Sequence, residues 1–380
     1  MRLSGSVSVF RDTWNEQLGD LARYRMAMEP SDGPDRQLWA RLANYWYRQV
    51  AYHVPDEGRI KHHLANMARP DALLQLFYYT TALVSVCPFP YARKPLSGLL
   101  DSYQGGCLRQ GSMVSALLAT HGVLLSHGST EHFLIRENHF LSLMRKEIEF
   151  SDGRGLQFVH IMSSNFASFL EYGAIESVVT TEFRQYYGRN TDTAHADAMK
   201  WAASKATDRT RQKDSSVDTP LPILPWTAFQ GGSLTFHTLQ LLLDRTENCA
   251  VGPGVHVSLA FIWCLTLHPS AIQHVEQAIP WSAIAKYLNS LLSPSTIFPK
   301  IEEESFPLLE GVAAQQLPED FLIHGKMWSQ LYYPECFFEG AQFELERPDI
   351  DVSSMAVIRD HRCLWLGVKI STVCDQLQLI

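Results

Sequence analysis

Apolar side chains recur along most of the chain with the spacing of helix faces. Between residues 38 and 54, apolar and small residues return every three to four positions, which places them on one face of a helix. The same period runs through residues 59–68 and from residue 71 to near 88. No stretch shows the alternation of apolar and polar residues that a half-buried strand needs. The pattern therefore predicts an all-α protein.

The stretch 18–25, which reads Leu-Gly-Asp-Leu-Ala-Arg-Tyr-Arg, is predicted to lie on a first helix that begins near Asp12. Gly19 has no side chain, so a second helix can pack closely against the backbone there. Arg23 and Arg25 stand beside this contact and can bring positive charge to a groove. The alternative is that both arginines are solvated and that Asp20 pairs with one of them.

Helical patterns continue through the rest of the chain. Segments 107–126 and 130–150 are predicted to pair as antiparallel helices, with Ser129 as the N-cap of the second. Further helices are predicted at 158–172, 176–187, 233–247, 256–267, 270–278, 281–292 and from Ser353 or Ser354 to about 373. Segment 293–316 is predicted to be a loop. Segment 205–225 is polar and then rich in proline, so we expect an exposed loop or a disordered insertion there.

Composition and charge exclude some classes of protein. Hydrophobic residues make up 46% and charged residues 19% of the chain, which is ordinary for a globular protein. The net charge of −8 argues against a protein that simply coats nucleic acid. The first 100 residues hold 12 Lys and Arg against 9 Asp and Glu, whereas the remainder holds 20 against 31. A basic front and an acidic remainder fit a polyanionic or phosphorylated partner at the front.

The most apolar stretch, 255–267, is too short to cross a bilayer and contains His256, so it is predicted to be a buried helix. The N-terminus lacks the long apolar run of a signal peptide. We therefore expect no membrane association.

No motif points to catalysis. Gly252-Pro253-Gly254 lacks the third glycine and the lysine of a phosphate-binding loop, and no nucleophile elbow occurs. The seven cysteines form no Cys-x-x-Cys, so buried thiols in a reducing compartment are expected. The histidines lack metalloprotease spacing. We expect neither catalytic residues, nor a metal site, nor a cofactor.

Two residue spacings within the first 70 residues suggest how the helices there pack on one another. Ala43-x3-Tyr47-x2-Val50-x4-Pro55 has the spacing of the second helix of a tetratricopeptide repeat. Leu-Gly at residues 18–19 and Leu-Ala at 64–65 take the corresponding place in first helices. Two repeats are too few to be stable alone, so flanking helices must cover them. Aromatic and arginine side chains also interleave over 39–48, where core packing and stacking on nucleic acid bases are the alternatives.

Short motifs with a recognisable order extend from about residue 15 to about residue 370. They lie at residues 18–25, 46–47, 58–65, 68–70, 75–79, 88–89, 164–173, 317–321 and 362–367. Together they resemble segments of the ever shorter telomeres family, above all its fungal members. That family includes a telomerase-associated subunit and the SMG adaptor proteins of nonsense-mediated mRNA decay.

The resemblance implies a fold and a domain division. Residues 1–100 would form part of a 14-3-3-like tetratricopeptide domain, and residues 101–380 an extension of α-helical hairpins. It further implies a non-catalytic adaptor, located in the nucleus and cytoplasm, that binds phosphorylated protein or ribonucleoprotein partners in mRNA decay or telomere maintenance. A phosphoserine-containing protein is the expected partner. A heterodimer through helical domains, and direct binding of RNA or single-stranded DNA by the basic front, are further expectations.

The resemblance also indicates a site. Arg23 takes the place of the groove arginine with which the decay adaptors bind phosphoserine, and a guanidinium fork suits a phosphate dianion. Arg25, Arg59 and Lys61 are expected to add positive charge nearby. Family members begin with several helices upstream of the Leu-Gly-Asp motif, and these supply a lysine to the same pocket. Only about fifteen residues precede the motif here, so we expect an N-terminally truncated member that lacks part of this pocket.

Overall fold

A computed structural model describes the chain over most of its length. It covers residues 4–30, 33–105, 111–150, 155–184, 200, 204, 224–245, 247–293, 296–309, 315–339, 355–374 and 377. Helices dominate these residues, and the only β-structure among them is two isolated bridges. The predicted all-α fold is confirmed. The predicted insertion at 205–225 lies almost entirely outside the described residues.

The helices follow one another in the predicted order. The front of the chain forms α1 (Ser4–Met28), α2 (Pro34–His53), α3 (Gly58–Met67), α4 (Ala72–Val84) and α5 (Arg93–Gln104). The middle forms α6 (Met113–Leu125), α7 (Thr130–Phe150), α8 (Gly155–Phe169), α9 (Val178–Arg184) and α11 (Trp226–Leu243). The remainder forms α12 (Gly252–Thr266), α13 (Pro269–Val275), α14 (Trp281–Leu291), α15 (Phe298–Glu302), α16 (Pro318–Ile323) and α17 (Ala356–Val373).

Two local predictions are confirmed by contacts. A Cβ atom on Gly19 would lie 2.7 Å from the ring of Tyr47, so α1 and α2 do pack closely at this glycine. The Ser129 hydroxyl accepts a hydrogen bond from the backbone N–H of His132 at 3.2 Å, as an N-cap does at the start of α7.

Several helix boundaries differ from the prediction; the helix predicted at 233–247, for example, is α11 and begins at Trp226. The first helix begins at Ser4 rather than near Asp12, because adding a turn to an existing helix costs less than starting a new one, even with weak helix formers. The predicted loop at 293–316 contains α15. Ile301 of α15 is buried in the main core, and the indole N–H of Trp365 donates to the carbonyl of Glu303 at 3.0 Å. A five-residue helix is too short to show an apolar period in the sequence. Its place in the structure therefore depends on its contact with α17.

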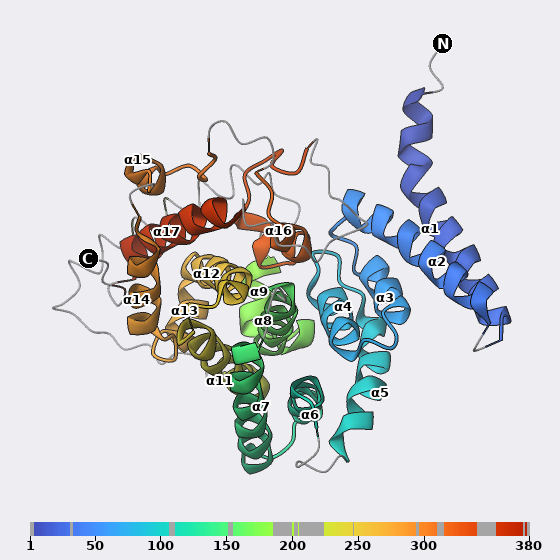
Figure 1. Cartoon of the computed structure of the whole chain (residues 1–380), viewed down its shortest axis with the longest axis horizontal. Coiled ribbons are helices and arrows are strands. Elements are labelled where there is room, and N and C mark those ends of the chain that lie inside the picture. The colour runs from blue at the N-terminus through green and yellow to red at the C-terminus, as the bar shows by residue number, and fades with distance from the viewer. Residues whose placement is uncertain are drawn as a thin grey trace.

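Helices α8 and α12 lie at the centre of the molecule, with α1 and α2 at one edge and α14 and α17 toward the opposite side (Figure 1). The rings of Phe166 and Phe261 stack between them with centroids 4.1 Å apart. The window Cys249–Thr266 is apolar enough to span a membrane by length and composition, but 89% of it is buried inside the fold. The prediction of a buried helix at 255–267 is therefore confirmed.

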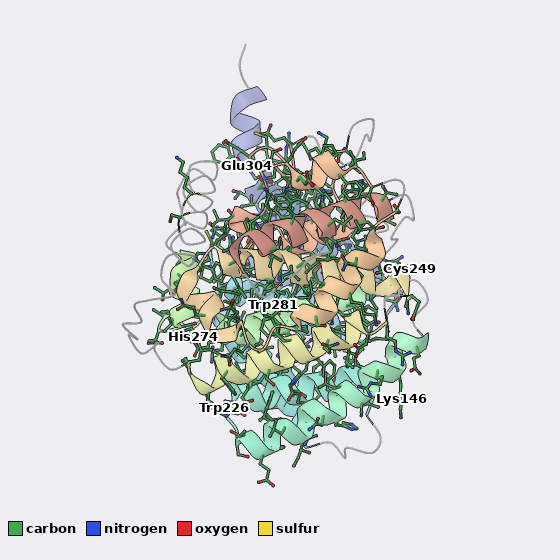
Figure 2. The ribbon with its side chains drawn as sticks, turned by 90° about the vertical axis from the view of Figure 1, so that its left-hand side faces the viewer. Lys146, Trp226, Cys249, His274, Trp281 and Glu304 are labelled. Carbon is green, nitrogen blue, oxygen red and sulfur yellow. The ribbon has the colours of Figure 1, made fainter. Side chains whose placement is uncertain are left out.

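The side view shows how the remaining helices are layered. From the bottom of Figure 2, α7 is followed by α11, which begins at Trp226, and then by α14 and α17 toward the top. The buried residues of α4 and α5 belong to the same hydrophobic core as those of α8, α11 and α12. The division of the chain at residue 100 stays a prediction. A smaller cluster of buried residues joins α1, α2 and α3.

The segment after α16 returns to the front of the chain. The backbone N–H of Val86 donates to the carbonyl of Gly325 at 3.0 Å, and the N–H of Met327 donates to the carbonyl of Val84 at 2.9 Å. Gly325 has φ of +80°, and a Cβ there would lie 2.1 Å from the carbonyl oxygen of Pro55. Only glycine fits this crossing. The C-terminal part of the chain is thereby fixed against α2 and α4.

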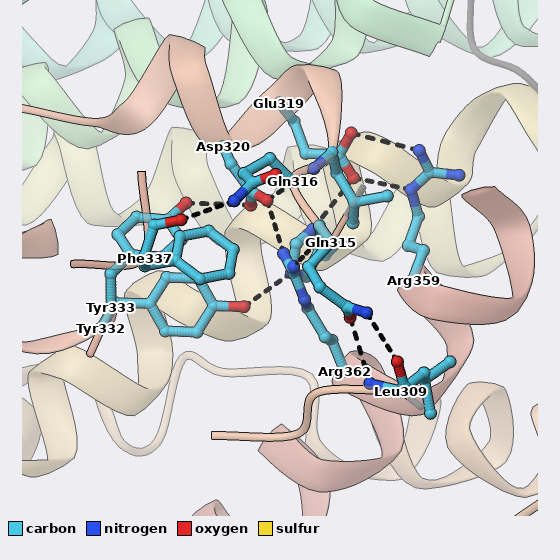
Figure 3. Close-up of polar contacts among 12 residues, drawn as sticks. Leu309, Gln315, Gln316, Glu319, Asp320, Tyr332, Tyr333, Phe337, Arg359 and Arg362 are labelled. Atoms are coloured by element: carbon cyan, nitrogen blue, oxygen red, sulfur yellow. Dashed lines mark hydrogen bonds and ion pairs between the residues drawn. The ribbon is translucent and has the colours of Figure 1, made fainter. Parts of the chain in front are cut away.

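Two buried ion pairs hold α16 on α17, as Figure 3 shows. Arg359 donates to both carboxylate oxygens of Glu319, at 2.6 and 3.1 Å, and Arg362 donates to Asp320 at 2.6 Å. Asp320 also accepts from the backbone N–H of Leu317 at 2.7 Å, so this carboxylate caps the start of α16 as well. The arginine partners were not predicted.

The surroundings keep Glu319 ionised. Burial raises the pKa of this carboxyl, but the charge of Arg359 and hydrogen bonds from His256 and Arg359 outweigh burial and hold the pKa well below its usual value. His256 donates from Nδ1 to Glu319 at 3.0 Å, and its Nε2 accepts from the hydroxyl of Tyr332 at 2.7 Å. All of these groups are closed to solvent, so the arrangement connects α12, α16 and α17 inside the fold.

We predict that Arg362→Met destabilises the protein by about 3–5 kcal/mol, because it leaves Asp320 buried without its cation. Urea unfolding followed by circular dichroism measures the loss. Arg25→Met is the control, since Arg25 is exposed and its pair with Glu29 contributes less than about 1 kcal/mol. Equal effects of the two substitutions would contradict the importance given to the buried pair.

Candidate anion-binding site

The predicted groove residue Arg23 is held by a carboxylate. Its Nε donates to the hydroxyl of Tyr47 at 3.2 Å, and its Nη2 donates to Asp20 at 3.2 Å. The hydroxyl of Tyr47 donates to the same Asp20 oxygen at 2.7 Å. The alternative in which Asp20 pairs with an arginine is therefore present in the structure. The side chain of Arg23 remains 28% exposed, so it is neither buried nor unpaired.

The other two predicted arginines also have acidic partners. Arg25 pairs with Glu29, directly after the end of α1, at 2.8 Å. Arg59 binds both carboxylate oxygens of Glu16. Burial raises the pKa of Glu16 more than the charge of Arg59 lowers it. Because each guanidinium already faces a carboxylate, an incoming anion would have to displace that partner or share it.

Lys61 lies apart from the pairs made by Arg59 and Arg23. It is 7% exposed and lines a cavity of about 180 Å³ formed by α2, α3, α4, α8 and α16. Within the described residues it forms no ion pair, and Asp56 is the acidic group that acts on it electrostatically. Burial lowers the pKa of Lys61 to about 8, against the opposing influence of Asp56. The structure thus does not bring the four predicted residues together in one pocket.

The cavity collects polar groups from segments far apart in the chain. Arg48 comes from α2, His160 from α8, and His324 directly follows α16. The remaining walls are largely apolar or aromatic and include Ala51, Tyr52, Leu64, Leu74, Phe77, Tyr78, Leu156, Phe321 and Leu322. Asp71 is the one carboxylate among the lining residues, and it is engaged at the start of α4, where it accepts from the backbone N–H of Leu74 at 2.9 Å.

The cations of the cavity are not compensated by this carboxylate. The Nε of Arg48 is buried and has no hydrogen-bond partner in the part of the chain that the structure describes. Behind the wall, buried Lys326 donates to the hydroxyl of Thr81 at 2.6 Å and lies over the ring of Phe77 at 4.7 Å. Burial, and then the charge of Lys61, lower the pKa of Lys326 well below its usual value. Buried positive charge without a counterion is costly, so an anion in this cavity would be stabilised.

The two histidines contribute hydrogen-bonding groups rather than charge. Burial, together with the charges of Lys326 and Arg48, lowers the pKa of His160 to about 3. Burial and the charge of Lys61 lower the pKa of His324 to about 3 as well. At neutral pH both imidazoles are uncharged, and each offers one donor and one acceptor. The positive charge that lines the cavity therefore comes from Arg48 and Lys61.

Two larger hollows occur among the described residues, but one, of about 810 Å³, has no Lys or Arg in its lining, and in the other, of about 510 Å³, Arg93 and Lys94 are exposed to solvent. No group of three or more His, Cys, Asp or Glu side chains in the described part of the chain is placed to hold a metal ion. Sequence reasoning placed Arg48 and Lys61 on the correct helices, but it grouped Lys61 with the arginines and did not find His160, His324 or Lys326. One signal was available, because Lys61 lies three and four residues before the buried Leu64 and Ala65 and so shares their core-facing side.

We predict that Lys61→Met stabilises the protein at pH 7 by about 2–3 kcal/mol, because it removes a buried ammonium group whose interaction with Asp56 does not offset the cost of burial. Folding lowers the pKa of Lys61 from 10.5 to about 8, so the unfolded chain binds more protons between these values. The stability of the wild type should rise with pH across this window, and the advantage of Lys61→Met should disappear above about pH 10.5. Urea unfolding at several pH values measures both effects.

Lys286→Met on the exposed face of α14 is the matched control, and it should leave stability unchanged. A Lys61→Met variant that is less stable than the wild type at pH 7 would show that Lys61 is already paired and would contradict the cavity's uncompensated charge.

Neither the comparison with protein-family models nor that with curated proteins gives a match. The case for a function therefore depends on the geometry of the cavity and on the motifs along the chain.

Proposed function

We propose that the protein is a non-catalytic adaptor that recognises a phosphorylated protein partner and takes the phosphate into the cavity lined by Arg48 and Lys61. The observation that carries the proposal is that both cations face one cavity in which Asp71, the one carboxylate among the described lining residues, is occupied in capping α4. A guanidinium group binds a phosphate dianion through charge-assisted hydrogen bonds, and an ammonium group adds a second positive charge.

The cavity supports this role better than the arginines of α1 and α3 do. A phosphate at Arg23 would compete with Asp20, and a phosphate at Arg59 would compete with Glu16. In the cavity a phosphate instead meets the unsatisfied Nε of Arg48. The neutral imidazole of His160 or His324 can donate one further hydrogen bond. We keep Arg23 as a second, weaker contact for the same partner.

The partners we propose follow from the family resemblance. The motifs at 18–25, 164–173 and 362–367 resemble those of adaptors in nonsense-mediated mRNA decay and of a telomerase-associated subunit. We therefore propose a phosphoserine-containing protein or ribonucleoprotein of one of these pathways as the partner, in the nucleus and cytoplasm. Association with a related helical domain as a heterodimer is part of the same proposal.

The alternative is direct binding of single-stranded RNA or DNA by the front of the molecule. Tyr45 of α2 is 48% exposed and can stack on a base, whereas Trp39 packs against the small core of α1, α2 and α3. Net charge and the paired arginines do not favour this alternative.

We predict that a fluorescently labelled phosphoserine peptide binds more tightly than its unphosphorylated form, and that Arg48→Met weakens binding of the phosphopeptide about 10- to 100-fold. The loss follows from removal of the charge-assisted hydrogen bonds to phosphate. Fluorescence anisotropy measures both affinities. Arg41→Met, on an exposed position of the same helix, is the matched control and should leave binding unchanged.

Three outcomes distinguish the two possible phosphate sites and the two classes of ligand. A loss with Arg23→Glu but not with Arg48→Met would place the phosphate at α1. Equal affinity for the two peptides would overturn phosphate recognition altogether. Tight binding of a single-stranded oligonucleotide that weakens steeply with salt would favour the nucleic acid alternative.

A further inference from the structure

Helix α1 carries a second apolar face that nothing in the described structure covers. Phe10, Trp14, Leu21 and Met28 are spaced by four and seven residues, so they share one side of the helix. Each of these side chains is more than half exposed, from 52% at Trp14 to 76% at Met28. The opposite side of α1, at Gly19 and Ala22, already packs on α2.

The exposed face is large and continuous. Leu18 and Tyr24, exposed to 41% and 57%, lie at its two edges. From Phe10 to Met28 the face extends about 27 Å along the helix. Folded proteins seldom leave so many large apolar side chains together in water, and such patches mark interaction sites. Among the described residues, the neighbouring α2 exposes a shorter set, Leu38, Leu42 and Tyr45, and others such as Phe229 of α11 stand apart.

The chemistry of the face fits a helix of another protein molecule. Its polar members are Gln17 within the stripe and Arg11 and Arg25 along one edge, and Arg25 is paired with Glu29. A surface that binds nucleic acid or lipid needs a run of basic side chains beside the apolar ones. α1 has no such run, so the occupant we consider is a second apolar helix.

The spacing of the face is nearly symmetric about Gly19. Phe10 and Met28 each lie nine residues from Gly19, and Trp14 and Tyr24 each lie five residues from it. When two such helices pair antiparallel with a two-fold axis near Gly19, Phe10 of one copy therefore lies beside Met28 of the other. Trp14 and Tyr24 meet in the same way, whereas at the centre Leu21 of each copy lies opposite Gln17 of the other. A self-complementary surface of this kind is what a two-fold dimer requires.

The position of the helix allows this pairing. Helices α1 and α2 form one edge of the molecule, and α1 is the outer of the two (Figure 1). A second α1 can stack there as the next helix of the layer, which would cover the apolar end of both helix stacks. From the mirrored spacing, the exposure and the edge position, we infer that the protein forms a two-fold dimer through antiparallel pairing of α1.

Charge exchange at the ends of the face tests the dimer in the full chain. Analytical ultracentrifugation should show a dimer for the wild type and monomers for Phe10→Lys and for Met28→Glu, since each places a charge in the apolar contact. The double variant should recover the dimer, because the introduced lysine faces the introduced glutamate of the other copy. Phe229→Lys is the matched control and should remain dimeric. Circular dichroism should show unchanged helix content in all variants.

Each contrary result overturns the inference. A monomeric wild type shows that the face has another occupant, and a dimer that survives both single substitutions shows that a different surface is used. A double variant that stays monomeric excludes the antiparallel register. The outcome is independent of the phosphate site, because no substituted residue lines the cavity.

Discussion

The cost of burying charge governs this molecule. Among the described residues, some buried charges in the interior have an oppositely charged partner and others do not. The two kinds lie on either side of α16 and the residues that follow it. On the α17 side, the guanidinium groups of Arg359 and Arg362 meet Glu319 and Asp320 with good geometry, so buried charge fixes the fold. On the front side, Lys61 has no such partner among the described residues. The first arrangement holds the segment in place, and the second leaves a positive cavity beside it.

These two arrangements are physically coupled through α16. The ion pairs lock α16 on α17, and the residues that follow α16 cross to the front, where Gly325 hydrogen-bonds to Val86. This crossing carries His324 into the wall of the cavity and Lys326 behind it. The cavity therefore exists only when the C-terminal segment has returned to the front helices. A front fragment alone would keep Arg48 and Lys61 but would lack the wall that carries Phe321, Leu322 and His324.

Helix α1 shows why charge and function need not coincide. Its arginines are the most conspicuous basic residues at the front, yet Asp20 and Glu29 neutralise Arg23 and Arg25 locally. Such exposed pairs stabilise a helix little and leave little attraction for an anion. The apolar face of α1 is the less conspicuous feature, but it is the one that remains without a partner in the described structure. The apolar side of α1 is therefore a better candidate for binding a partner than its arginines are.

The sequence by itself determined the all-α fold, the order of the helices, the close contact at Gly19 and the cap at Ser129, because these follow from periodicity and short-range hydrogen bonds. It also placed Lys61 on the correct helix. Only the tertiary structure decided which charges are compensated, since the partner of Arg362 and the neighbours of Lys61 come from remote segments. Local sequence records which residues carry charge, but whether that charge is paired depends on packing between helices that no local pattern encodes.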